Sequence, residues 1–464
     1  MPMTAIILAA GEGTRMKSRH PKVTHNLLDR PLVSWVTRAA RAAGAERIVV
    51  VVGHGASEVR DCLAAEKDIE FVEQAERRGT GHAVKVALGE AHLTQGTLVV
   101  LYGDAPLVEP DTIRRLAGSV EREGAAEAML TWVPEDPTGY GRLEFAADGS
   151  VARIIEQKDC SPEQDRNLRS CNPGFYAFDA ATLAAHISEL SCANAQHELY
   201  LTDMVEILQA HGERVSAIEA TDTNELLGVN SRAQLAQLSC IARDRTNERL
   251  MAEGVTMLDP SLVWVGPDAT VGRDTELLPQ TMLWGQTHVG GGCVVGPNTR
   301  LTDCSVGDGS SVEETVGIQA TIEKNVTVGP RAYLRPGAHL LDRAHVGTHV
   351  EIKNSTIGVG SKVPHLSYIG DTTMGSGVNI GAGSITCNYD GVHKHRTTIG
   401  NDVFVGSDTM MVAPVTIGDG ALVGASSCIT HDVPSGALAL ERNEERIVEG
   451  YAAKRLDRLR RDNA

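Results

Sequence analysis

Apolar residues follow two different patterns, one in each half of the chain. In residues 1–227, short runs of β-branched residues and leucine alternate with segments of helical length. Nearly continuous apolar runs are typical of strands buried on both faces of a parallel sheet. The runs are Thr4–Ala9, Arg47–Val52 and Thr97–Tyr102, and the predicted helices between them are Pro31–Ala43 (followed by Gly44) and Gly81–Gly89. This alternation predicts an α/β fold of the Rossmann-like type, with ligands at the carboxyl ends of the strands.

From about residue 255 to 440 the pattern changes to Val-Gly and Ile-Gly pairs in steps of six residues. One aliphatic residue in six is typical of a parallel β-helix, in which this side chain points inward from each short strand. The pairs begin at Val265, Val271, Val289, Val295, Ile399, Val405, Ile417 and Val423. Three hexads make one triangular coil, so we expect roughly ten coils. The repeat is interrupted at Cys387–Thr398, which predicts a protruding loop.

These patterns predict four segments: an α/β domain over 1–227, a helical linker over 228–250, a β-helix over 251–442 and a charged tail over 443–464. In the linker, Ser231 and Gln234 could form a capping box. The tail ends in the basic run KRLDRLRR. We interpret it as a solvated helix, with a dedicated binding role as the alternative.

The composition excludes several classes of protein. The 464 residues carry a net charge of −17, which argues against nonspecific binding to nucleic acid or to an anionic membrane. No apolar run approaches the ~18 residues that span a bilayer, and the N-terminus does not resemble a signal peptide. The nine cysteines contain no Cys-x-x-Cys pair, which favours reduced thiols and a cytoplasmic location over a disulfide framework or a zinc site.

The first candidate site is the glycine-rich segment that follows the first strand. Glycines allow backbone N–H groups to approach phosphates, and Arg15 and Lys22 can neutralise the charge of a triphosphate during transfer. Met16 occupies the position of the third glycine of a dinucleotide fingerprint, and the ending of a P-loop is absent. The segment is therefore a different phosphate site. Its substrate-binding candidates are Leu8, Ala9, Ala10, Gly11 and Lys22.

The run Gly11-Glu12-Gly13-Thr14-Arg15-Met16, with Pro21-Lys22 after four residues, resembles the sugar-nucleotide pyrophosphorylases. The resemblance implies that Gln74, Gly79 and Thr80 contact the base. It also implies sugar-side contacts and a Mg²⁺ ion held by Asp104 and Asn230. The implied sugar-side contacts are Gly139-Tyr140-Gly141-Arg142, Glu156, Asn172 and Gly228-Val229-Asn230, and the other implied substrate-binding residues are Tyr102 and Gly103.

The chemistry of this site agrees with its residue types. Asp104 follows a predicted strand, and oxygen ligands are what Mg²⁺ prefers. Nucleotidyl transfer depends mostly on positioning and charge neutralisation, so no protein nucleophile is needed. Three simpler interpretations stay open: Gly11 and Gly13 could only turn the chain, Asp104 could be a surface carboxylate, and Asn230 could be a helix N-terminal residue beside Ser231.

The second candidate site consists of large polar residues within the repeats. A β-helix needs aliphatic, small and turn residues, so these side chains are extra to the fold. His365 is the natural general base, because imidazole titrates near neutrality. Arg335 and Lys353 could hold a phosphate, and Asn379 and Tyr389 could orient a sugar. Simpler interpretations are a surface role for His365, a coil cap for Tyr368 and an asparagine ladder for Asn379.

Together the two sites resemble the bifunctional family of N-acetylglucosamine-1-phosphate uridylyltransferases / glucosamine-1-phosphate acetyltransferases, over essentially the whole chain. The clearest match is Asn379–Gly383 with Thr386–Gly391. The resemblance implies a left-handed β-helix and a homotrimer. It also implies that His365 takes a proton from the amine of glucosamine 1-phosphate as that amine attacks acetyl-CoA.

The same resemblance assigns the other residues of the second site. Arg335, Lys353, Tyr368 and Asn379 would bind the amino sugar phosphate. The residues implied for acetyl-CoA are Ala382, Ser407, Ala425 and Arg442, and Asn388 and Tyr389 would contribute to the sugar or the acetyl-CoA site. Pro364 departs from the pattern of some members and, without an N–H, excludes an oxyanion role for its own backbone nitrogen.

The resemblance thus implies an enzyme that acetylates glucosamine 1-phosphate and then joins N-acetylglucosamine 1-phosphate to UTP, releasing pyrophosphate. Two alternatives are a monofunctional pyrophosphorylase with a structural β-helix and a nonenzymatic scaffold that binds sugar nucleotides. The group His365, Lys353, Arg335 and Asn379 argues against the first, because a structural β-helix has no need for it. Pyrophosphate release from UTP with Mg²⁺ would exclude the second.

Overall fold

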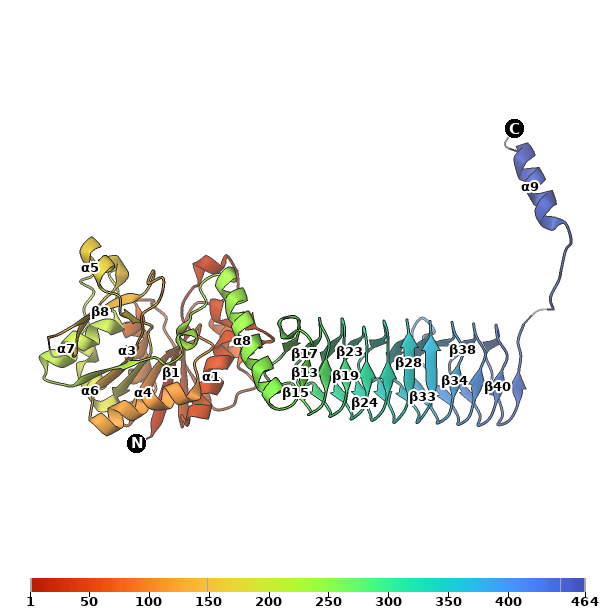
Figure 1. Cartoon of the computed structure of the whole chain (residues 1–464), viewed down its shortest axis with the longest axis horizontal. Coiled ribbons are helices and arrows are strands. Elements are labelled where there is room, and N and C mark those ends of the chain that lie inside the picture. The colour runs from red at the N-terminus through yellow and green to blue at the C-terminus, as the bar shows by residue number, and fades with distance from the viewer. Residues whose placement is uncertain (1, 148, 443, 463–464) are drawn as a thin grey trace. The chain divides into compact units, whose positions relative to one another are not determined.

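The computed structural model describes residues 2–147, 149–442 and 444–462. The chain divides into two compact units, Met1–Thr246 and Asn247–Ala464 (Figure 1). Each unit has its own hydrophobic core and is described separately below. Among the helices of the described residues, none combines the length and hydropathy that a membrane span requires.

The first unit contains a seven-stranded sheet with the order β12-β7-β11-β6-β1-β4-β5. Its pairs are parallel except those of β11, which runs antiparallel to β6 and β7. The strands are β1 (Met3–Leu8), β4 (Arg47–Val52), β5 (Ile69–Glu73), β6 (Thr97–Tyr102), β7 (Glu127–Thr131), β11 (Tyr176–Asp179) and β12 (Val215–Glu219). The α/β fold predicted from the apolar runs is confirmed, and the antiparallel strand β11 had no sequence signal.

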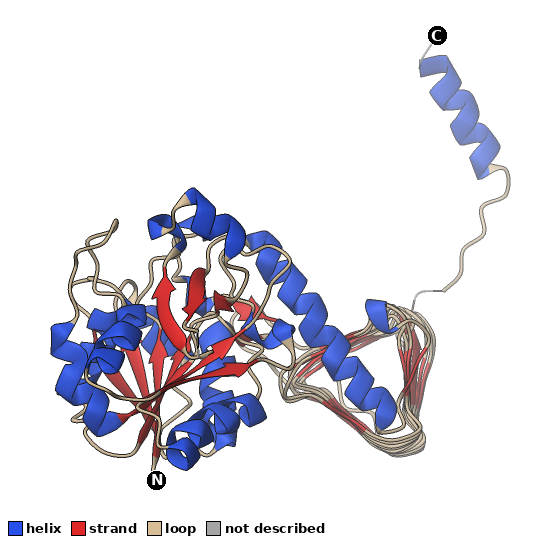
Figure 2. Ribbon diagram, turned by 60° about the vertical axis from the view of Figure 1, so that its left-hand side comes forward, coloured by secondary structure: helices blue, strands red, loops and turns tan. Residues whose placement is uncertain are grey.

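Helices cover both faces of this sheet (Figure 2). One face carries α1 (Leu32–Ala43), α2 (Ala56–Cys62) and α4 (Pro110–Glu123), and the other carries α3 (Thr80–Glu90), α6 (Ala180–His186) and α7 (Met204–Ala210). Helix α1 ends because Gly44 adopts φ 99°, a left-handed conformation that glycine accepts without strain. A small antiparallel sheet of β8 (Gly141–Phe145), β9 (Val151–Ile155) and β10 (Cys171–Asn172), together with α5 (Pro162–Asn167), completes the unit.

One buried carboxyl group stands out in the core of the first unit. Glu127 begins β7, is fully buried, and neither side-chain oxygen has a hydrogen-bond partner among the described residues. Burial therefore raises the pKa of Glu127 well above its usual value. The group is protonated in the folded protein at pH values at which the unfolded chain is already ionised.

We expect Glu127→Gln to remove a pH-dependent loss of stability. As pH rises above the ordinary pKa of a glutamate, the unfolded state loses its proton first, so the wild-type protein loses stability by up to about 1.4 kcal/mol per pH unit until the raised pKa is reached. The variant lacks this titration. Its free energy of unfolding relative to wild type, measured by urea unfolding, therefore rises between pH 5 and pH 7. Equal pH slopes for wild type and variant would contradict the prediction, and Glu90→Gln, at an exposed position, is the control.

A long helix, α8 (Arg232–Ala252), follows the sheet domain. It begins at Arg232 because the Ser231 hydroxyl accepts a hydrogen bond from the Gln234 backbone N–H at 3.2 Å. The Gln234 side chain accepts from the Asn230 N–H rather than from that of Ser231, so the expected capping box is formed only in part. The helix begins within the expected linker 228–250 and ends two residues beyond its bound of 250.

The second unit is a parallel β-helix with three faces, which Figure 2 shows as a triangle in cross-section. Each strand pairs in parallel with the strand three places further along the chain, except that β40 pairs with β42 at the end of the first face. The first face holds β13 (Thr256–Met257), β16 (Glu276–Leu277), β19 (Val294–Val295), β22 (Ser311–Val312), β25 (Thr327–Val328), β28 (His345–Thr348), β31 (Lys362–His365), β34 (Asn379–Ile380), β37 (Phe404–Val405), β40 (Leu422–Val423) and β42 (Leu438–Ala439).

The other two faces hold ten and nine strands. The second face consists of β14 (Trp264–Val265), β17 (Met282–Trp284), β20 (Arg300–Thr302), β23 (Val316–Ile318), β26 (Tyr333–Leu334), β29 (Glu351–Lys353), β32 (Tyr368–Gly370), β35 (Ile385–Cys387), β38 (Met410–Val412) and β41 (Cys428–Ile429). The third face consists of β15 (Thr270–Val271), β18 (His288–Val289), β21 (Ser305–Val306), β24 (Thr321–Ile322), β27 (His339–Leu340), β30 (Thr356–Ile357), β33 (Thr372–Met374), β36 (Thr397–Ile399) and β39 (Val415–Ile417).

The six-residue period follows from the packing of these coils. The aliphatic residue of each hexad, such as Val265 or Leu283, is fully buried in the core. The following glycine permits the next coil to approach, because a Cβ atom at Gly272 would lie 2.6 Å from the backbone of Gly290. At the corners, buried hydroxyl groups form hydrogen bonds with backbone groups that would otherwise lack a partner. Thr275, for example, donates to the Gly290 carbonyl at 2.7 Å.

Two segments of the second unit depart from the repeat. Between β35 and β36 lies the expected loop, in which Tyr389 and Val392 are 60% and 75% exposed. After the last strand, the described tail residues end in helix α9 (Tyr451–Asp462), all of whose residues are exposed.

Candidate active sites

A cavity of about 900 Å³ lies in the first unit, where strands β1 and β6 end. It is lined by most of the residues predicted for the nucleotide site: Leu8, Ala9, Ala10, Gly11, Lys22, Gln74, Gly79, Thr80, Tyr102, Asp104, Gly141, Glu156, Asn172 and Asn230. Gly103 lies outside the lining and donates its backbone N–H to the Leu8 carbonyl at 3.0 Å, which joins the ends of the two strands. Arg15 is also outside the lining but contacts Asn230.

Cationic and oxygen-bearing side chains meet at one end of this cavity. The Lys22 ammonium forms an ion pair with Asp104 and donates to Asn230 Oδ1 at 2.9 Å, and Arg15 donates to the same oxygen at 2.8 Å. The side chains of Lys22 and Asp104 are only 14% and 15% exposed. Gly13 permits this arrangement, because a Cβ atom there would lie 2.6 Å from Cβ of Lys22. The fold thus brings Lys22 into contact with Asp104 and Asn230, which lie 82 and 208 positions further along the chain.

At another part of the cavity, an amide side chain is held in a fixed orientation. Gln74 is buried, donates to the Gly79 carbonyl at 3.1 Å and lies 3.1 Å from Nδ1 of His82. The Thr80 hydroxyl accepts from the Leu201 N–H at 3.2 Å. A fixed amide beside a cavity is suited to hydrogen-bond a flat heterocycle such as a nucleobase.

A half-buried carboxyl group and an amide line a further part of the cavity. Burial raises the pKa of Glu156, whose Oε1 accepts a hydrogen bond from Thr202 at 3.2 Å. Asn172 donates to the Tyr176 hydroxyl at 2.5 Å and accepts from the Gly174 N–H at 3.0 Å. Such partly buried acceptors and amides are the groups that bind sugar hydroxyls.

Arg142 differs from the expectation of a sugar-side contact. Its side chain is 1% exposed and is absent from the cavity lining. The guanidinium donates to the carbonyls of Pro137 and Tyr140 and to Asp165 in α5 at 2.6 Å. Arg142 therefore supports the turn that brings Tyr140 and Gly141 to the cavity. It affects the site by positioning these residues and does not line the cavity itself.

Several lining residues were missed by the sequence reasoning. Arg77 lies in the lining and forms an ion pair with Glu12 at 3.1 Å. Four more come from one segment between α6 and α7, and are Gln196, Glu198, Tyr200 and Thr202. Arg77 stands two residues before Gly79, which was a usable signal. The segment 190–203 has neither a glycine motif nor a strand pattern, so nothing in the sequence indicated its position.

In the second unit, cations surround two carboxylates on the second face of the β-helix. Arg335 forms an ion pair with Glu351 at 2.8 Å, and Lys353 lies 3.6 Å from Asp371. Although partial burial opposes it, hydrogen bonds from Asn354 and Asn388 lower the pKa of Asp371, as do nearby lysines. Asn388 also donates to the Tyr368 hydroxyl at 3.4 Å. The register places Arg335 and Lys353 one coil apart at the end of this face.

Lys394 is a further member of this cluster that the sequence reasoning did not identify. It lies in the loop that interrupts the repeat and forms an isolated bridge with Tyr389. A contact with the Lys353 side chain, followed by the charge of the same group, lowers the pKa of Lys394. Three cations close together, with two carboxylates, make a site that attracts a phosphate dianion. In the sequence, Lys394 was one of several charged residues of an irregular loop.

The predicted base and three of the six predicted acetyl-donor residues occupy one edge of the β-helix. Strand pairing aligns Lys362, Asn379, Phe404 and Leu422 on successive coils. The residues three positions further, at the corner that leads to the second face, are His365, Ala382, Ser407 and Ala425. The close approach of Gly381 to Ser407, and of Gly406 to Ala425, agrees with this alignment.

Asn379, Tyr389 and Arg442 lie elsewhere. Asn379 begins β34 on the first face and pairs with Lys362 and Phe404, whereas Arg335, Lys353 and Tyr368 belong to the second face. Tyr389 is exposed in the interrupting loop, with its hydroxyl donating to the Gly391 carbonyl at 2.6 Å. Arg442 is exposed and follows the last strand.

Comparisons with known proteins cover both units. The MobA-like NTP transferase domain matches residues 5–254, and the bacterial transferase hexapeptide (six repeats) matches residues 396–431. A curated protein of Streptomyces avermitilis, "Bifunctional protein GlmU", is 47% identical over 98% of this chain and 95% of its own length. The chain belongs to the bifunctional GlmU family. Proteins of the same name from Kineococcus radiotolerans (48% identity, 98% and 93% coverage) and Heliobacterium modesticaldum (46%, 97% and 98%) are similar as well.

Membership in the GlmU family decides between the functions considered from the sequence. The chain is a bifunctional transferase of UDP-N-acetylglucosamine synthesis, with uridylyl transfer in its NTP transferase domain and acetylation in its hexapeptide domain. The alternatives of a monofunctional enzyme and of a nonenzymatic scaffold are therefore excluded. The hexapeptide match identifies the second unit as a left-handed β-helix. A solved structure of UDP-glucose pyrophosphorylase with UDP-glucose aligns with 53% of this chain and 100% of its own, at 18% identity and a TM-score of 0.42.

Proposed function

We propose that uridylyl transfer takes place in the cavity of the first unit and acetylation along one edge of the β-helix. The substrates are UTP and N-acetylglucosamine 1-phosphate in the cavity, and acetyl-CoA and glucosamine 1-phosphate on the β-helix. Mg²⁺ assists the first reaction. The domain boundaries expected from the sequence, 1–227, 228–250, 251–442 and 443–464, form part of this proposal.

The residues of the cavity fit a Mg²⁺ ion. Asp104 and Asn230 Oδ1 both contact the Lys22 ammonium, so a carboxylate and an amide oxygen already converge on one cation. Mg²⁺ is commonly held by one or two such oxygens together with substrate phosphates. When bound, the metal supplies charge neutralisation for the phosphates of UTP.

The chain's own residues would complete the uridylyl site. Lys22 and Arg15 offset negative charge as the sugar phosphate oxygen attacks the α-phosphate and pyrophosphate leaves. The amide of Gln74 orients the uracil ring, with the backbone at Gly79 and Thr80. Glu156 and Asn172 hold the hydroxyl groups of the sugar. The remaining substrate-binding candidates, from Leu8 to Gly11 with Tyr102, Gly103 and Gly141, shape the phosphate and sugar ends.

On the β-helix, the second face would bind the amino sugar. Arg335, Lys353 and Lys394 hold the phosphate, and Tyr368 orients the ring. His365 accepts the proton that the amine loses as its nitrogen attacks the thioester carbonyl, and the thiol of coenzyme A leaves. The residues proposed to line the acetyl-CoA groove are Ala382, Asn388, Tyr389, Ser407, Ala425 and Arg442.

The single observation that carries the proposal for acetylation is the row formed by His365, Ala382, Ser407 and Ala425. A base and three small residues form a continuous row at the start of the second face, whose other end carries the cation cluster, and small side chains leave room for an extended donor. One assay tests the proposal on the full chain. The rate of thiol release from acetyl-CoA with glucosamine 1-phosphate should fall when the indole of Ala425→Trp fills this edge. An unchanged KM for acetyl-CoA in that variant would contradict the assignment of this edge.

We further propose that the chain assembles as a homotrimer in which Asn379 completes the acetylation site of a neighbouring copy. Within one chain, Asn379 lies on the first face and the cation cluster lies on the second. A flat-faced solenoid with threefold symmetry can bring the first face of one copy to the second face of the next. Outward Phe404, Leu422 and Leu438 are exposed in the same row as Asn379 and supply apolar area for such packing.

Mixed trimers test the placement of Asn379. We expect Asn379→Ala and Arg335→Ala each to lose most acetylation, and a mixture assembled from equal amounts of both to regain about a quarter of the wild-type rate, because about one site in four then joins two intact faces. Thiol release after mixed refolding measures the rate, and light scattering verifies the trimer. Mixed trimers without regained activity would contradict a shared site.

Arg142→Met is expected to weaken sugar binding in uridylyl transfer. The substitution removes the support of the turn that carries Tyr140 and Gly141, and misplacement by about 1 Å costs up to about 100-fold in rate. We expect KM for N-acetylglucosamine 1-phosphate to rise about tenfold or more while acetylation stays unchanged. If KM for UTP rose equally, a general loss of structure would explain the result better, and partial rescue by Arg142→Lys supports the positioning role.

We also propose a cytoplasmic location. All nine cysteines are free thiols, which suits a reducing compartment. The proposed substrates are small molecules, and neither nucleic acid nor a membrane is proposed as a partner, since the net charge of −17 repels both.

A further inference from the structure

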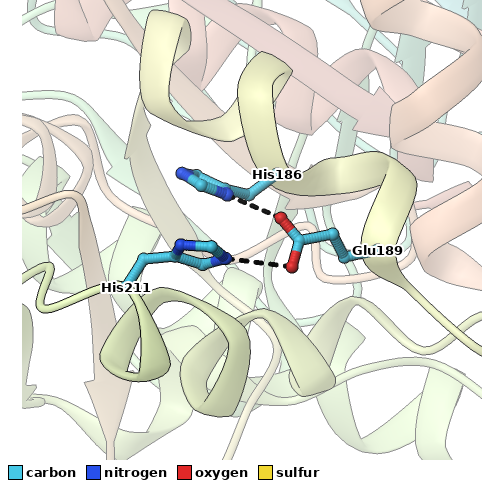
Figure 3. Close-up of side chains that lie close together, drawn as sticks. All are labelled: His186, Glu189 and His211. Atoms are coloured by element: carbon cyan, nitrogen blue, oxygen red, sulfur yellow. Dashed lines mark hydrogen bonds and ion pairs between the residues drawn. The ribbon is translucent and has the colours of Figure 1, made fainter.

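A cluster of two histidines and one glutamate lies in the first unit, outside the cavity lining (Figure 3). His186 ends α6, Glu189 lies in the following turn and His211 follows α7. The two carboxylate oxygens of Glu189 are divided between the rings: Oε1 lies 2.7 Å from Nδ1 of His186, and Oε2 lies 3.0 Å from Nε2 of His211. The ring centroids are 4.1 Å apart.

The arrangement presents three potential ligands to one point. One nitrogen from each ring and a carboxylate oxygen lie within 4.8 Å of one another. Both histidines turn a nitrogen toward the same carboxylate, so a cation placed between them would meet two imidazoles and an oxygen. In metal sites with bonds of about 2.0–2.2 Å, the ligand atoms lie somewhat closer together than this, which small rotations of the side chains would achieve.

The types of ligand indicate the class of metal. Two imidazoles with one carboxylate suit a transition metal such as Zn²⁺, whereas Mg²⁺ and Ca²⁺ prefer oxygen ligands. The exposed fractions of the side chains are 19% for His186 and 44% for Glu189 and His211. A metal can therefore enter from solvent, and water can fill the remaining coordination position.

We propose that His186, Glu189 and His211 form a binding site for a divalent transition metal, with Zn²⁺ as the best fit. The ligating atoms are Nδ1 of His186, Nε2 of His211 and a carboxylate oxygen of Glu189. Without metal, hydrogen bonds from the two rings to this carboxylate occupy the same atoms and lower the pKa of Glu189. On binding, each ring presents an unprotonated nitrogen and carries its proton on the other nitrogen.

The position of the cluster suggests what the metal does. His186 and Glu189 stand directly before the irregular segment 190–203, and His211 stands after the helix that follows it. That segment contributes Gln196, Glu198, Tyr200 and Thr202 to the cavity. A metal held from both sides clamps the two ends of the segment together, so it stabilises the folded first unit increasingly as the free metal concentration rises above the Kd of the site.

Zinc titration of the full chain tests the proposal. After removal of metals with a chelator, and with Mg²⁺ present in excess, we expect calorimetry to find one more Zn²⁺ equivalent per chain in wild type than in the double variant His186→Gln with His211→Gln. Each single variant should weaken that equivalent by about tenfold or more, as should Glu189→Gln. His288→Gln, at an exposed histidine of the β-helix, is the matched control and should bind as wild type does.

A second measurement identifies the ligands. Co²⁺ added in place of Zn²⁺ should give visible absorption bands of a nitrogen- and oxygen-ligated ion in wild type and in the His288 control, and these bands should be absent in the double variant. Circular dichroism and uridylyl transfer verify that the variants fold, which is expected because the three side chains are partly exposed. Equal zinc stoichiometry and affinity in wild type and double variant would overturn the proposal, as would cobalt spectra that do not differ.

Discussion

Asp104→Ala will lower uridylyl transfer by about 10³-fold or more and leave acetylation unchanged. The substitution removes the carboxylate that converges with Asn230 on Lys22, and with it the charged ligand proposed for Mg²⁺. Lys22, only 14% exposed, is left beside an amide oxygen in a less favourable position. Pyrophosphate release from UTP and N-acetylglucosamine 1-phosphate measures the loss.

Acetylation in the same preparation serves as the internal control, because it reports whether the chain is folded. Asp111→Ala, which removes an exposed carboxylate at the start of α4, should leave both reactions unchanged. Uridylyl transfer within tenfold of wild type in Asp104→Ala would show that this carboxylate does not hold the metal.

His365→Ala is the reciprocal experiment. We expect thiol release from acetyl-CoA to fall about 10²–10⁴-fold, which is the usual contribution of a general base, and uridylyl transfer to keep its rate. The imidazole lies at the corner between the first and second faces, and the cation cluster occupies the second face of the neighbouring coils. Its removal eliminates the proposed proton acceptor without removing any buried aliphatic residue of the core.

A histidine on the third face provides a matched control for this substitution. His339→Ala removes an imidazole paired with Glu323 and should leave acetylation unchanged. If His365→Ala abolished both reactions in a folded chain, the assignment of one reaction to each unit would be wrong. If acetylation survived, another group on this edge must accept the proton.

The fold could be predicted from the sequence because its signals are local and repeated. The runs Arg47–Val52 and Thr97–Tyr102 are strands with the predicted bounds, since consecutive β-branched residues and leucines suit a strand that is buried on both faces. The hexad glycines marked the coils because each coil approaches the next too closely for a Cβ atom. Strand β11 was not predicted, since it is only four residues long and its antiparallel pairing with β6 and β7 joins segments far apart in the sequence.

The candidate sites were predictable only where residues stand in a motif. Lys22 and Asp104 were identified because each follows a glycine-rich or strand signal. Lys394 and the residues of segment 190–203 were missed, because irregular segments carry no period and their positions depend on contacts far along the chain. Arg142 was placed in the wrong role, since nothing in the sequence distinguishes a guanidinium that supports a turn from one that contacts substrate.

The alignment of residues along one edge of the β-helix could not be predicted from the sequence either. His365, Ala382, Ser407 and Ala425 are separated by 17, 25 and 18 residues, because the interrupting loop lengthens one coil. The printed sequence therefore hides their alignment, and only the strand pairing shows it. The residues themselves could be proposed by resemblance, but their common edge could not.

The regular stacking of coils gives this edge a fixed pitch. Each coil adds about 4.8 Å, the spacing of hydrogen-bonded strands, so three steps from His365 to Ala425 measure about 14 Å. An extended arm laid along this edge from Ala425 would therefore bring its reactive end to the imidazole only if it spanned about 14 Å. Inserting or deleting one complete coil between these residues would change the reach of the arm while leaving every chemical group intact.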